Sequence, residues 1–464
     1  MTLIKSISGI RGTIGGEPGE NLTPLDAVKF ASAYAKWLKE ASGKNAPTVA
    51  IGRDARLSGA MIQALVQNTL LGMGCHIIDL GLSTTPTVEI AVPLEKADGG
   101  IILTASHNPK QWNALKLLNH KGEFLDGVEG QKILDTAAAE DFNYVEVDHL
   151  GTVKVIKDYI DRHVDLVLDM SVTKVEAIKA MNFKVVVDGV NSTGGIAVPA
   201  LLKKLGVEVI ELYCEPTGHF PHNPEPLKEH LGDLAAAVVE QKADFGITVD
   251  PDVDRLAFMT EEGEMFGEEY TLVACADYIL GIHKGNTVSN LSSSRALRDV
   301  TESHGGTYYA AAVGEVNVVQ KMKEVHAVIG GEGNGGIIYP DSHYGRDALV
   351  GIAMFLSLLT EKKMKVSELR ASYPEYYMSK KKVQLTKGMP VDDIMTDIAT
   401  TYASEDLTTI DGVKIDFPTQ WVHMRKSNTE PIIRIYTEAP SQQEADQLAD
   451  RFILELEAIA QEYA

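Results

Sequence analysis

Three consecutive segments read TVAIGRD (Thr48–Asp54), SGAMIQALVQNTLLGMG (Ser58–Gly74) and CHIIDLG (Cys75–Gly81). An apolar run ends in a polar loop, a helical pattern follows and stops at glycine, and a second apolar run begins. The apolar runs are continuous rather than alternating, which is typical of parallel strands that are covered on both faces. Gly74 stands where the end of a helix favours a left-handed residue. The three segments therefore predict a strand–helix–strand unit of an α/β fold.

The same pattern occurs twice more along the chain. The second copy, over 183–213, reads FKVVVDG, STGGIAVPALLKKLG and VEVIELY, and the third, over 287–314, reads TVSNLSS, SRALRDVTESHGG and TYYAAAVG. Gly206 ends the second helical pattern, and Gly305 or Gly306 ends the third. Each copy continues into another apolar strand: GGIILTAS, ADFGITVD and HAVIGGEG. Three units about a hundred residues apart predict three similar α/β domains that arose by triplication.

The C-terminal part of the chain follows a different pattern. Short strands are expected around Lys380–Leu385, Thr409–Phe417 and Pro431–Thr437, interleaved with two helices. The final helix opens with Ser441 and Glu444, which have the spacing of a capping box. One apolar stripe follows, formed by Ala445, Leu448, Ala449, Phe452, Leu456 and Ile459. This pattern predicts a fourth domain of the α+β type.

The length of 464 residues alone suggests three domains of about 150 residues each, but the sequence patterns divide the chain into four. We expect domain I at 1–150, domain II at 151–256, domain III at 257–372 and domain IV at 373–464. The predicted fold class is α/β, with mixed, mainly parallel sheets in the first three domains and an α+β domain at the end. No linker is rich in glycine, proline or serine, so we expect the domains to surround a central cleft.

The charge balance disfavours polyanionic partners. Lys and Arg number 43 against 65 Asp and Glu, a net charge of -22, which repels nucleic-acid phosphates and anionic lipids. We therefore expect no nucleic-acid and no membrane partner, and a phosphorylated substrate would need a locally basic pocket. No apolar run reaches the roughly 18 residues of a membrane span. Three scattered cysteines argue against a disulfide framework, so we expect a cytoplasmic protein.

The first motif that carries chemistry is TASHNP (Thr104–Pro109), directly after an apolar strand. Pro109 disfavours a helical conformation before it, so we expect an exposed turn that presents Ser106, with Lys116 returning to the same rim. When the motif is taken alone, ordinary turn chemistry is the better explanation of it. A Ser-His-Asp hydrolase is less attractive, because the adjacent side chains of Ser106 and His107 point apart on an extended segment.

The second motif is the acidic run DPDVDR, with Asp250, Asp252 and Asp254 at alternate positions. On an extended loop, the three carboxylates point to one side, and their repulsion favours a hard divalent cation such as magnesium. A calcium-binding EF-hand is a rival, with Glu261 at its twelfth position, but Arg255 stands where the sharp turn needs glycine. A solvated acidic loop is the remaining alternative.

Two further loops could bind a ligand. In GGEGNGG, over 330–336, Glu332 and Asn334 occupy alternate positions and could bind hydroxyl groups, although a flexible hairpin would look the same. The segment RKSNTEP begins at Arg425 and leads into a strand that carries Arg434. Two arginines, hydroxyls and loop amides suit a phosphate dianion, and an ordinary polar turn is the alternative.

Together and in this order, these segments resemble the α-D-phosphohexomutase superfamily, which includes phosphoglucomutase/phosphomannomutase and phosphoglucosamine mutase. The resemblance covers the whole chain, including SGIRG at 8–12 and GRD at 52–54. It implies a four-domain enzyme, an intramolecular phosphotransferase of the isomerase class, which interconverts the 1-phosphate and 6-phosphate of a hexose. An active-site phosphoserine gives its phosphate to the sugar, and the resulting 1,6-bisphosphate reorients and returns the other phosphate to the serine.

Carried over by motif, the resemblance implies three groups of site residues. The catalytic residues are Ser106 as phosphoserine, Lys116, Arg11, Arg255 and His107. The metal ligands are Ser106, Asp250, Asp252 and Asp254. The substrate-binding residues are Glu332 and Asn334 for sugar hydroxyls, and Arg425, Ser427, Asn428, Thr429 and Arg434 for the phosphate that is not reacting. Three carboxylates, magnesium and a phosphoserine of charge about -2 leave about -3, which Arg11, Lys116 and Arg255 would match.

Several residues depart from the commonest bacterial pattern. Glu315 follows Val313-Gly314, where the family often has His, while Asn334 and Gly336 stand where many members have Ser and His. These changes resemble the archaeal-like phosphoglucosamine mutase branch. We therefore predict a phosphoglucosamine mutase that interconverts glucosamine 6-phosphate and glucosamine 1-phosphate.

Two alternatives to this prediction stay open. A phosphomannomutase/phosphoglucomutase is the nearer one, and a non-catalytic sugar-phosphate sensor is the more distant. The predicted cofactors are Mg²⁺, phosphorylated Ser106 and a hexose 1,6-bisphosphate as activator. The predicted partner is a small-molecule sugar phosphate, and the protein is expected to be a monomer or a homodimer.

Overall fold

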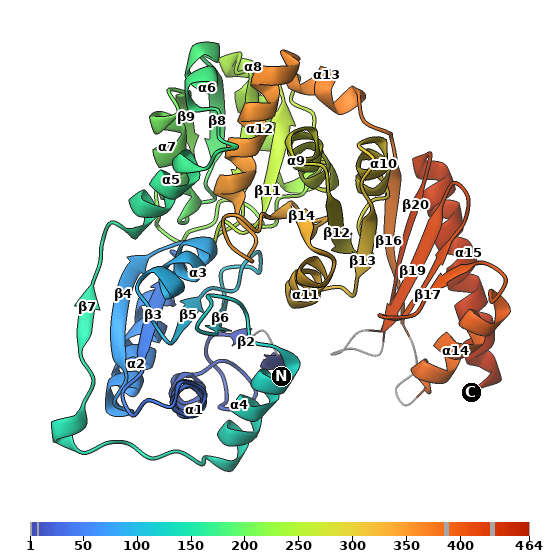
Figure 1. The fold of residues 1–464 in the computed structure, drawn as a ribbon. Coiled ribbons are helices and arrows are strands. Elements are labelled where there is room, and N and C mark those ends of the chain that lie inside the picture. Colours follow the sequence, from blue (N-terminus) through green and yellow to red (C-terminus); the bar gives the residue numbers. More distant parts are fainter. Residues whose placement is uncertain (1, 7–8, 385–388, 427–431, 464) are drawn as a thin grey trace. The chain divides into compact units, whose positions relative to one another are not determined.

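The computed structural model describes residues 2–6, 9–384, 389–426 and 432–463 (Figure 1). The chain forms two compact units. The first unit comprises Met1–Ile279 and Asn334–Arg370, and the second comprises Leu280–Gly333 and Ala371–Ala464. The third α/β copy of the sequence, over 287–314, therefore lies wholly in the second unit, whereas the expected domain III at 257–372 is divided between the two units.

The first sheet of the first unit has seven strands, and it is parallel in one half and antiparallel in the other. In spatial order the strands are β1 (Ile4–Ser6), β2 (Gly9–Thr13), β6 (Trp112–Leu118), β5 (Gly99–Leu103), β3 (Thr48–Arg53), β4 (His76–Leu82) and β7 (Val153–Val155). Strands β5, β3, β4 and β7 are parallel, while β1, β2 and β6 are joined antiparallel. The strand–helix–strand prediction for 48–81 is confirmed.

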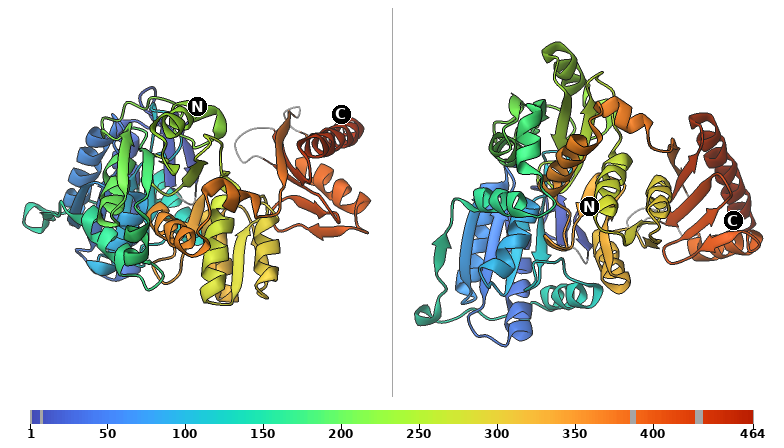
Figure 2. Two further views of the ribbon diagram at one scale, coloured as in Figure 1. Left: turned by 90° about the horizontal axis from the view of Figure 1, so that it is seen from above. Right: turned by 45° about the horizontal axis from the view of Figure 1, so that its top comes forward.

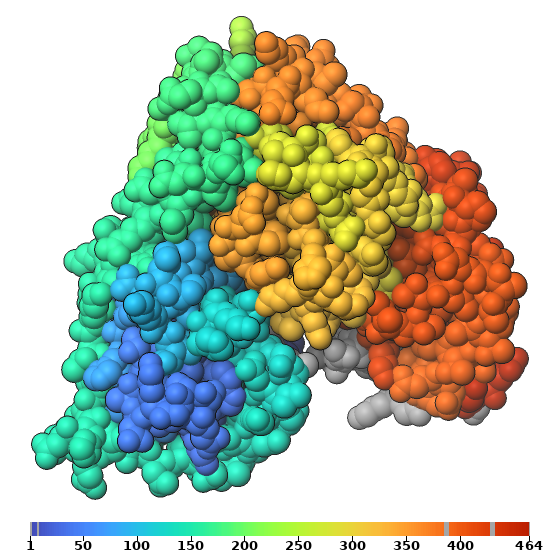
Figure 3. All heavy atoms as spheres, viewed as in Figure 1, coloured from blue at the N-terminus to red at the C-terminus, as the bar shows by residue number. Residues whose placement is uncertain are grey.

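Helices cover both faces of this sheet, as the continuous apolar strands require. The helices are α1 (Pro24–Ser42), α2 (Gly59–Gly72), α3 (Thr85–Leu94) and α4 (Gly127–Ala139). Val49 and Ile51 of β3 share one core cluster with residues of α1, α2 and α4, whereas Ala50 packs with α3 on the other face. After α4, a segment with the short 3₁₀ helix η1 (Val147–His149) runs along the surface to β7, at the lower left edge of Figure 3.

The second sheet of the first unit has four strands. Their order is β11 (Leu256–Thr260), β10 (Phe245–Val249), β8 (Lys184–Asp188) and β9 (Glu208–Leu212). Only β10 and β11 pair antiparallel, and the other pairs are parallel. The helices and short turns around it are α5 (Tyr159–Asp169), α6 (Val175–Met181), α7 (Gly194–Lys204), η2 (Lys228–His230) and α8 (Gly232–Gln241). The acidic run with Asp250, Asp252 and Asp254 lies in the hairpin between β10 and β11 of this sheet.

The remaining elements of the first unit complete its core. They are most of α9 (Glu268–Ile282), β15 (Gly336–Ile338), α12 (Ala348–Lys362) and most of α13 (Val366–Ala371). Every residue of α12 from Ala348 to Thr360 is buried, which explains why its sequence is apolar all round. Phe355 of α12 stacks on Phe258 of β11, with ring centroids 3.8 Å apart. Helix α12 is therefore part of the core beneath the metal loop.

The second unit contains a parallel sheet and an antiparallel sheet. The first has β12 (Asn286–Asn290) between β13 (Tyr308–Ala311) and β14 (Ala327–Glu332), with helices α10 (Ala296–Ser303) and α11 (Glu315–Val325). The second, in spatial order, has β16 (Tyr377–Gln384), β20 (Ile432–Ala439), β19 (Trp421–Lys426), β18 (Val413–Asp416) and β17 (Asp406–Thr408). Helices α14 (Val391–Thr401) and α15 (Gln442–Glu462) share its core, and Figure 2 shows α15 along one face of the sheet.

Most sequence predictions of the elements are confirmed, and three details are corrected. Gly74, Gly206 and Gly305 follow their helices with φ of 80°, 72° and 69°, as predicted. Strand β19 was not predicted, so Arg425 lies on a strand and not in a loop. The final helix has only half of the predicted capping box, because the Glu444 carboxylate accepts from the Ser441 hydroxyl instead of the backbone. The loops after β5 and β10 are the third correction, because Ser106 and Val253 have left-handed φ values and the loops are not extended. Within the described ranges, no helix has the length and apolarity needed to cross a membrane.

A loop of the first unit is anchored by a histidine–carboxylate pair. His222 Nε2 lies 2.9 Å from Asp188 Oδ2 at the end of β8, and its Nδ1 lies 2.8 Å from the carbonyl oxygen of Asn223. Burial lowers the pKa of His222, but the hydrogen bond and charge of Asp188 more than offset this, so that the pKa is raised. The pair fixes the loop that carries Glu225 into the site.

We expect His222→Gln to lower the free energy of unfolding by about 1–2 kcal/mol at pH 6, and by less at pH 9. Because the folded-state pKa lies above the ordinary value of about 6.5, the stabilisation is complete below that value and is lost as the pH rises through the folded pKa. Urea unfolding of both proteins across this pH range measures the difference. His219→Gln, at an exposed neighbouring histidine, is the control. A difference that grows with pH would contradict the assignment.

Candidate active site

The Ser106 loop follows β5 and is buried rather than exposed, which corrects the sequence prediction. Ser106 is only 3% exposed, and its Oγ donates a hydrogen bond to Asp250 Oδ2 at 2.7 Å. The loop is not extended, because Ser106 has a left-handed φ of 49° and its N–H bonds to Thr104 Oγ1. A loop from the second sheet thus covers a turn that the local sequence predicts to be open.

The guanidinium of Arg56 holds the backbone of this loop. Its side chain is fully buried and donates to the carbonyl oxygens of four residues: Ser106, Asn108 at 2.7 Å, Pro109 at 2.8 Å and Trp112 at 3.0 Å. Its Nε donates to Asp54 Oδ2 at 2.9 Å, and that oxygen also accepts from Thr104 Oγ1. All the donors of one arginine therefore fix the position of the serine. Sequence reasoning did not select Arg56, although it stands two residues after the GRD motif.

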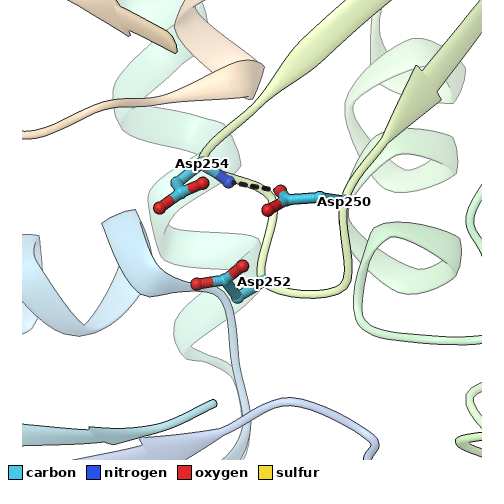
Figure 4. Close-up of side chains that lie close together, drawn as sticks. All are labelled: Asp250, Asp252 and Asp254. Carbon is cyan, nitrogen blue, oxygen red and sulfur yellow. Dashed lines mark hydrogen bonds between the residues drawn. The ribbon is translucent and has the colours of Figure 1, made fainter. Parts of the chain in front are cut away.

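The three aspartates lie in the tight hairpin between β10 and β11, and not on an extended loop as predicted. Asp250 Oδ1 accepts from the backbone N–H groups of Asp254 and Arg255, and Val253 has a φ of 64°. The turn brings one carboxylate oxygen from each aspartate within 4.8 Å of the others (Figure 4). The three carboxylates converge as predicted, but a tight turn brings them together and not an extended loop.

The carboxylates fit a divalent cation. All three are fully buried, and the Oδ1 atoms of Asp252 and Asp254 accept no hydrogen bond from any described residue. Buried oxygens without donors are costly, and hard cations bind carboxylate oxygens of this kind. Asp250, Asp252 and Asp254 could therefore hold a metal ion, with Ser106 next to them.

Cations from separate elements surround the three carboxylates. Lys116 of β6 places its Nζ 2.7 Å from Asp252 Oδ2 and 3.4 Å from Asp254 Oδ2. Arg346 Nη2 lies 2.8 Å from Asp254 Oδ2, and Thr85 Oγ1 donates to Asp252 Oδ2 at 2.6 Å. Lys116, which the sequence places near the serine loop, thus lies beside two of the three aspartates. Arg346 and Thr85 were not selected from the sequence, because both are far along the chain from the acidic run that they contact.

Burial and these charges shift the pKa values in opposite directions. Burial raises the pKa of Asp250, and its neighbours Asp254 and Asp252 raise it further. Burial also opposes ionisation of Asp254, but the charges of Arg346 and Lys116 outweigh it and hold the pKa well below its usual range. Burial lowers the pKa of Lys116, but Asp252 and Asp254 more than offset this, so that it is raised and the amine stays a cation.

His107, Arg11 and Arg255 approach the same loop. His107 Nδ1 lies 3.4 Å from Ser106 Oγ, so the two side chains do not point apart, because Ser106 is left-handed. Burial, with the charges of Arg255 and Arg11, lowers the pKa of His107 to about 2. Arg11 Nη1 donates to Asn108 Oδ1 at 3.0 Å, while Arg255 Nη1 lies 3.3 Å from Glu225 Oε1. Glu225 is a further site residue that the sequence analysis missed.

Three of the other predicted ligand-binding residues, Glu332, Arg425 and Arg434, lie in the second unit. Glu332 Oε1 accepts from Asn290 Nδ2 at 2.9 Å and from the N–H of Gly314 at 3.2 Å. Asn334 belongs to the first unit, where its Oδ1 accepts from the N–H of Gly336. Ser427, Asn428 and Thr429 lie outside the described residues.

Arg425 and Arg434 are direct cross-strand neighbours on β19 and β20, and Lys382 of β16 stands opposite Arg434 in turn. Side chains directly opposite each other share one face of a sheet, so like charges here repel. Asp411 Oδ1, 3.0 Å from Arg425 Nε, relieves part of this repulsion. A row of three cations on neighbouring strands is the arrangement that an anion would stabilise.

Models of four phosphoglucomutase/phosphomannomutase domains match nearly the whole chain. The alpha/beta/alpha domains I, II and III match residues 3–144, 157–263 and 267–377, and the C-terminal domain matches residues 361–455. The chain belongs to the phosphoglucomutase/phosphomannomutase family. The predicted resemblance and fold class are thereby confirmed, and the chain is a phosphohexomutase enzyme of the isomerase class.

Individual relatives agree on the family but differ in the named sugar. The chain is 35% identical over 443 residues to a phosphoglucomutase/phosphomannomutase of Thermococcus kodakarensis, covering 94% of this chain and 95% of the relative. It is 34% identical over 450 residues to a probable phosphoglucosamine mutase of Methanopyrus kandleri, covering 96% of each. A solved family protein from Burkholderia thailandensis shares 26% identity and a TM-score of 0.84, over 99% of this chain and 98% of that one.

For this family member, we expect Arg56→Lys to lower kcat by about 100-fold, because a lysine cannot hold four carbonyls and the serine would shift. Steady-state kinetics on a hexose phosphate, with thermal unfolding to confirm folding, measures the effect. Arg53→Lys is the matched control, since Arg53 bonds to Gln63 and to the Asp54 carbonyl rather than to the serine loop. Equal kcat values for the wild type and Arg56→Lys would refute the positioning role.

Proposed function

We propose that the chain is a phosphoglucosamine mutase that interconverts glucosamine 6-phosphate and glucosamine 1-phosphate. The observation that carries this proposal is the hydrogen bond between Ser106 Oγ and Asp250, inside a buried group of three carboxylates and Lys116. A serine in that position can carry a phosphoryl group next to a cation site. The name of the M. kandleri relative supports the choice of sugar.

In the proposed reaction, the bond from Ser106 Oγ to phosphorus breaks as a sugar hydroxyl forms a new bond to the same phosphorus. The sugar hydroxyl gives up its proton and Ser106 Oγ takes one up as it leaves, so that the serine ends as a free hydroxyl. When the bisphosphate has turned around, Ser106 Oγ bonds to the other phosphorus as the sugar O–P bond breaks, and the proton of the serine hydroxyl is replaced by one on the sugar oxygen. A divalent cation held by Asp250, Asp252 and Asp254 would neutralise charge on the phosphoryl group during transfer. Because phosphoryl transfer needs little covalent help from the protein, positioning and charge dominate the catalysis.

The chain's own residues supply that positioning. Against the effect of burial, Asp252 and Asp254 raise the pKa of Lys116, so it supplies a positive charge beside them and could donate a proton. His107 stays neutral beside Ser106. Arg11 and Arg255 add positive charge near the serine loop, and hexose 1,6-bisphosphate would be the primer that phosphorylates Ser106.

The remaining proposed contacts hold the sugar and its second phosphate. Glu332, held by Asn290 and the Gly314 backbone, would accept from sugar hydroxyls, together with Asn334. Arg425 and Arg434 would bind the phosphate that is not reacting, with Ser427, Asn428 and Thr429 completing that site. The charge of the second unit's cation row, Lys382 included, supports an anion there.

A local feature of the second unit favours an amino sugar. Glu332 accepts from the N–H of Gly314, and the next residue, Glu315, stands where the family often has His. Two acidic residues at this point favour the cationic 2-ammonium group of glucosamine over the neutral 2-hydroxyl of glucose or mannose. A phosphomannomutase/phosphoglucomutase remains the second candidate, which the name of the T. kodakarensis relative supports.

Ser106→Ala is expected to abolish turnover while sugar-phosphate binding changes by less than about threefold, because the deleted hydroxyl carries the phosphoryl group and little binding energy. Kinetics, calorimetric titration with glucosamine 6-phosphate and intact-mass detection of a phosphate on the wild type test this. Ser42→Ala, at the end of α1, should behave as the wild type. Normal turnover in Ser106→Ala would refute the phosphoserine.

Rates on the phosphates of glucosamine, glucose and mannose, each with Mg²⁺ and its bisphosphate, should favour glucosamine in kcat/KM by about tenfold or more. Glu315→Gln should reduce this preference severalfold and leave the rates on glucose phosphate nearly unchanged, because only the ammonium group loses a charge partner. Equal kcat/KM on all three sugars would refute the amino-sugar preference and leave the mutase in place. A preference for mannose or glucose phosphate would establish the second candidate.

A further inference from the structure

Arg346 is the cation that sequence reasoning left out of the site. It directly precedes Asp347, the N-cap residue of α12, and its Nη2 lies 2.8 Å from Asp254 Oδ2. Its side chain is only 10% exposed. The Arg346–Asp254 bond joins the residue before the N-cap of α12 to the hairpin of the three aspartates, within the first unit.

The backbone around Arg346 is held firmly. The Asp347 carboxylate caps α12 by accepting from the N–H groups of Leu349 and Val350, and its other oxygen lies 2.8 Å from His163 Nε2. The Asp347 N–H donates to the carbonyl oxygen of Ile337 at 2.8 Å. Arg346 therefore approaches Asp254 from an anchored position and not from a flexible surface loop.

Gly336 makes room for the arginine stem. A Cβ atom at Gly336 would lie 2.3 Å from Arg346 Cδ, which is too close for any side chain without a shift of the arginine. Many family members have His at position 336. In this chain Gly336 has no side chain, and the stem of Arg346 occupies the space that one would need. The two features belong together physically, although they are ten residues apart.

The charges of the site explain what Arg346 does. Two of the three buried carboxylates, Asp252 and Asp254, lie beside Lys116, while the guanidinium of Arg255 lies 3.3 Å from Glu225 and is partly neutralised by it. Without Arg346, the trio would carry more negative charge than its neighbours offset. Such a site would bind a divalent cation more tightly and would repel an incoming phosphate dianion more strongly.

We propose that Arg346 is a positioning residue that sets the charge of the metal site, weakening its grip on the divalent cation so that a phosphate dianion can enter. This inference rests on the proposed function. Arg346 holds Asp254 in place and offsets part of its negative charge. Glu225 offsets part of the positive charge of Arg255. The two residues therefore have opposite effects on the same site.

The test measures Mn²⁺ binding to the full-length protein by electron paramagnetic resonance, without substrate or turnover. Arg346→Gln should lower the Mn²⁺ dissociation constant by about tenfold and should raise KM for glucosamine 6-phosphate. Arg346→Lys, which keeps the charge, should leave the dissociation constant within about twofold of the wild type. Weaker or unchanged Mn²⁺ binding in Arg346→Gln would overturn the proposal, because it would show a purely structural contact.

A second variant keeps the proposal testable if Arg346→Gln does not fold. Glu225→Gln frees the charge of Arg255, so it should raise the Mn²⁺ dissociation constant severalfold, opposite to Arg346→Gln. An unchanged or lower dissociation constant in Glu225→Gln would overturn the charge argument. Asp252→Asn separates this failure from that of the proposed function. If Asp252→Asn leaves Mn²⁺ binding unchanged, the three aspartates are not the metal site and the proposed function itself fails.

Discussion

Burying three carboxylates within 4.8 Å of one another is the constraint on which the first unit's site depends. Such a cluster is expensive unless charges and hydrogen bonds compensate it. The compensation comes from several elements: the hairpin's own backbone N–H groups bond to Asp250, Lys116 of β6 faces Asp252, and Arg346 reaches Asp254 from before α12. The site therefore joins two sheets and a core helix, and none of these elements can move without disturbing the others.

The serine loop is subject to a second constraint, which is that its buried backbone carbonyl oxygens need hydrogen-bond donors. A buried turn cannot leave its carbonyl oxygens without donors. The guanidinium of Arg56 supplies them to four residues of the loop, and Asp54 in turn orients the guanidinium. Ser106 then reaches Asp250 in a left-handed conformation. The positions of Ser106 and of the three aspartates are thus fixed by different residues, although Ser106 and Asp250 are in contact.

The sequence predicted the parts that depend on local pattern. Continuous apolar runs and the glycines at 74, 206 and 305 located strands and helix ends, because these signals lie within one element. The motifs around Ser106 and Asp250 also located the candidate site. The exposure of Ser106 could not be predicted, because the residue that contacts it is 144 positions away. Arg56, Glu225 and Arg346 were missed for the same reason, since a single arginine or glutamate has no local signature until the fold brings its partners together.

The division of the chain between the two units has a consequence for synthesis on the ribosome. The first unit is interrupted by Leu280–Gly333 and is completed only by Asn334–Arg370. Helix α12, whose residues 348–360 are wholly buried, belongs to that late segment. A nascent chain that has emerged only as far as residue 279 lacks this helix, so the apolar surface it covers stays uncovered in the growing polypeptide. Acquisition of a finished acidic centre is therefore a late event in the life of the molecule, although both the serine and the aspartates are translated before that segment.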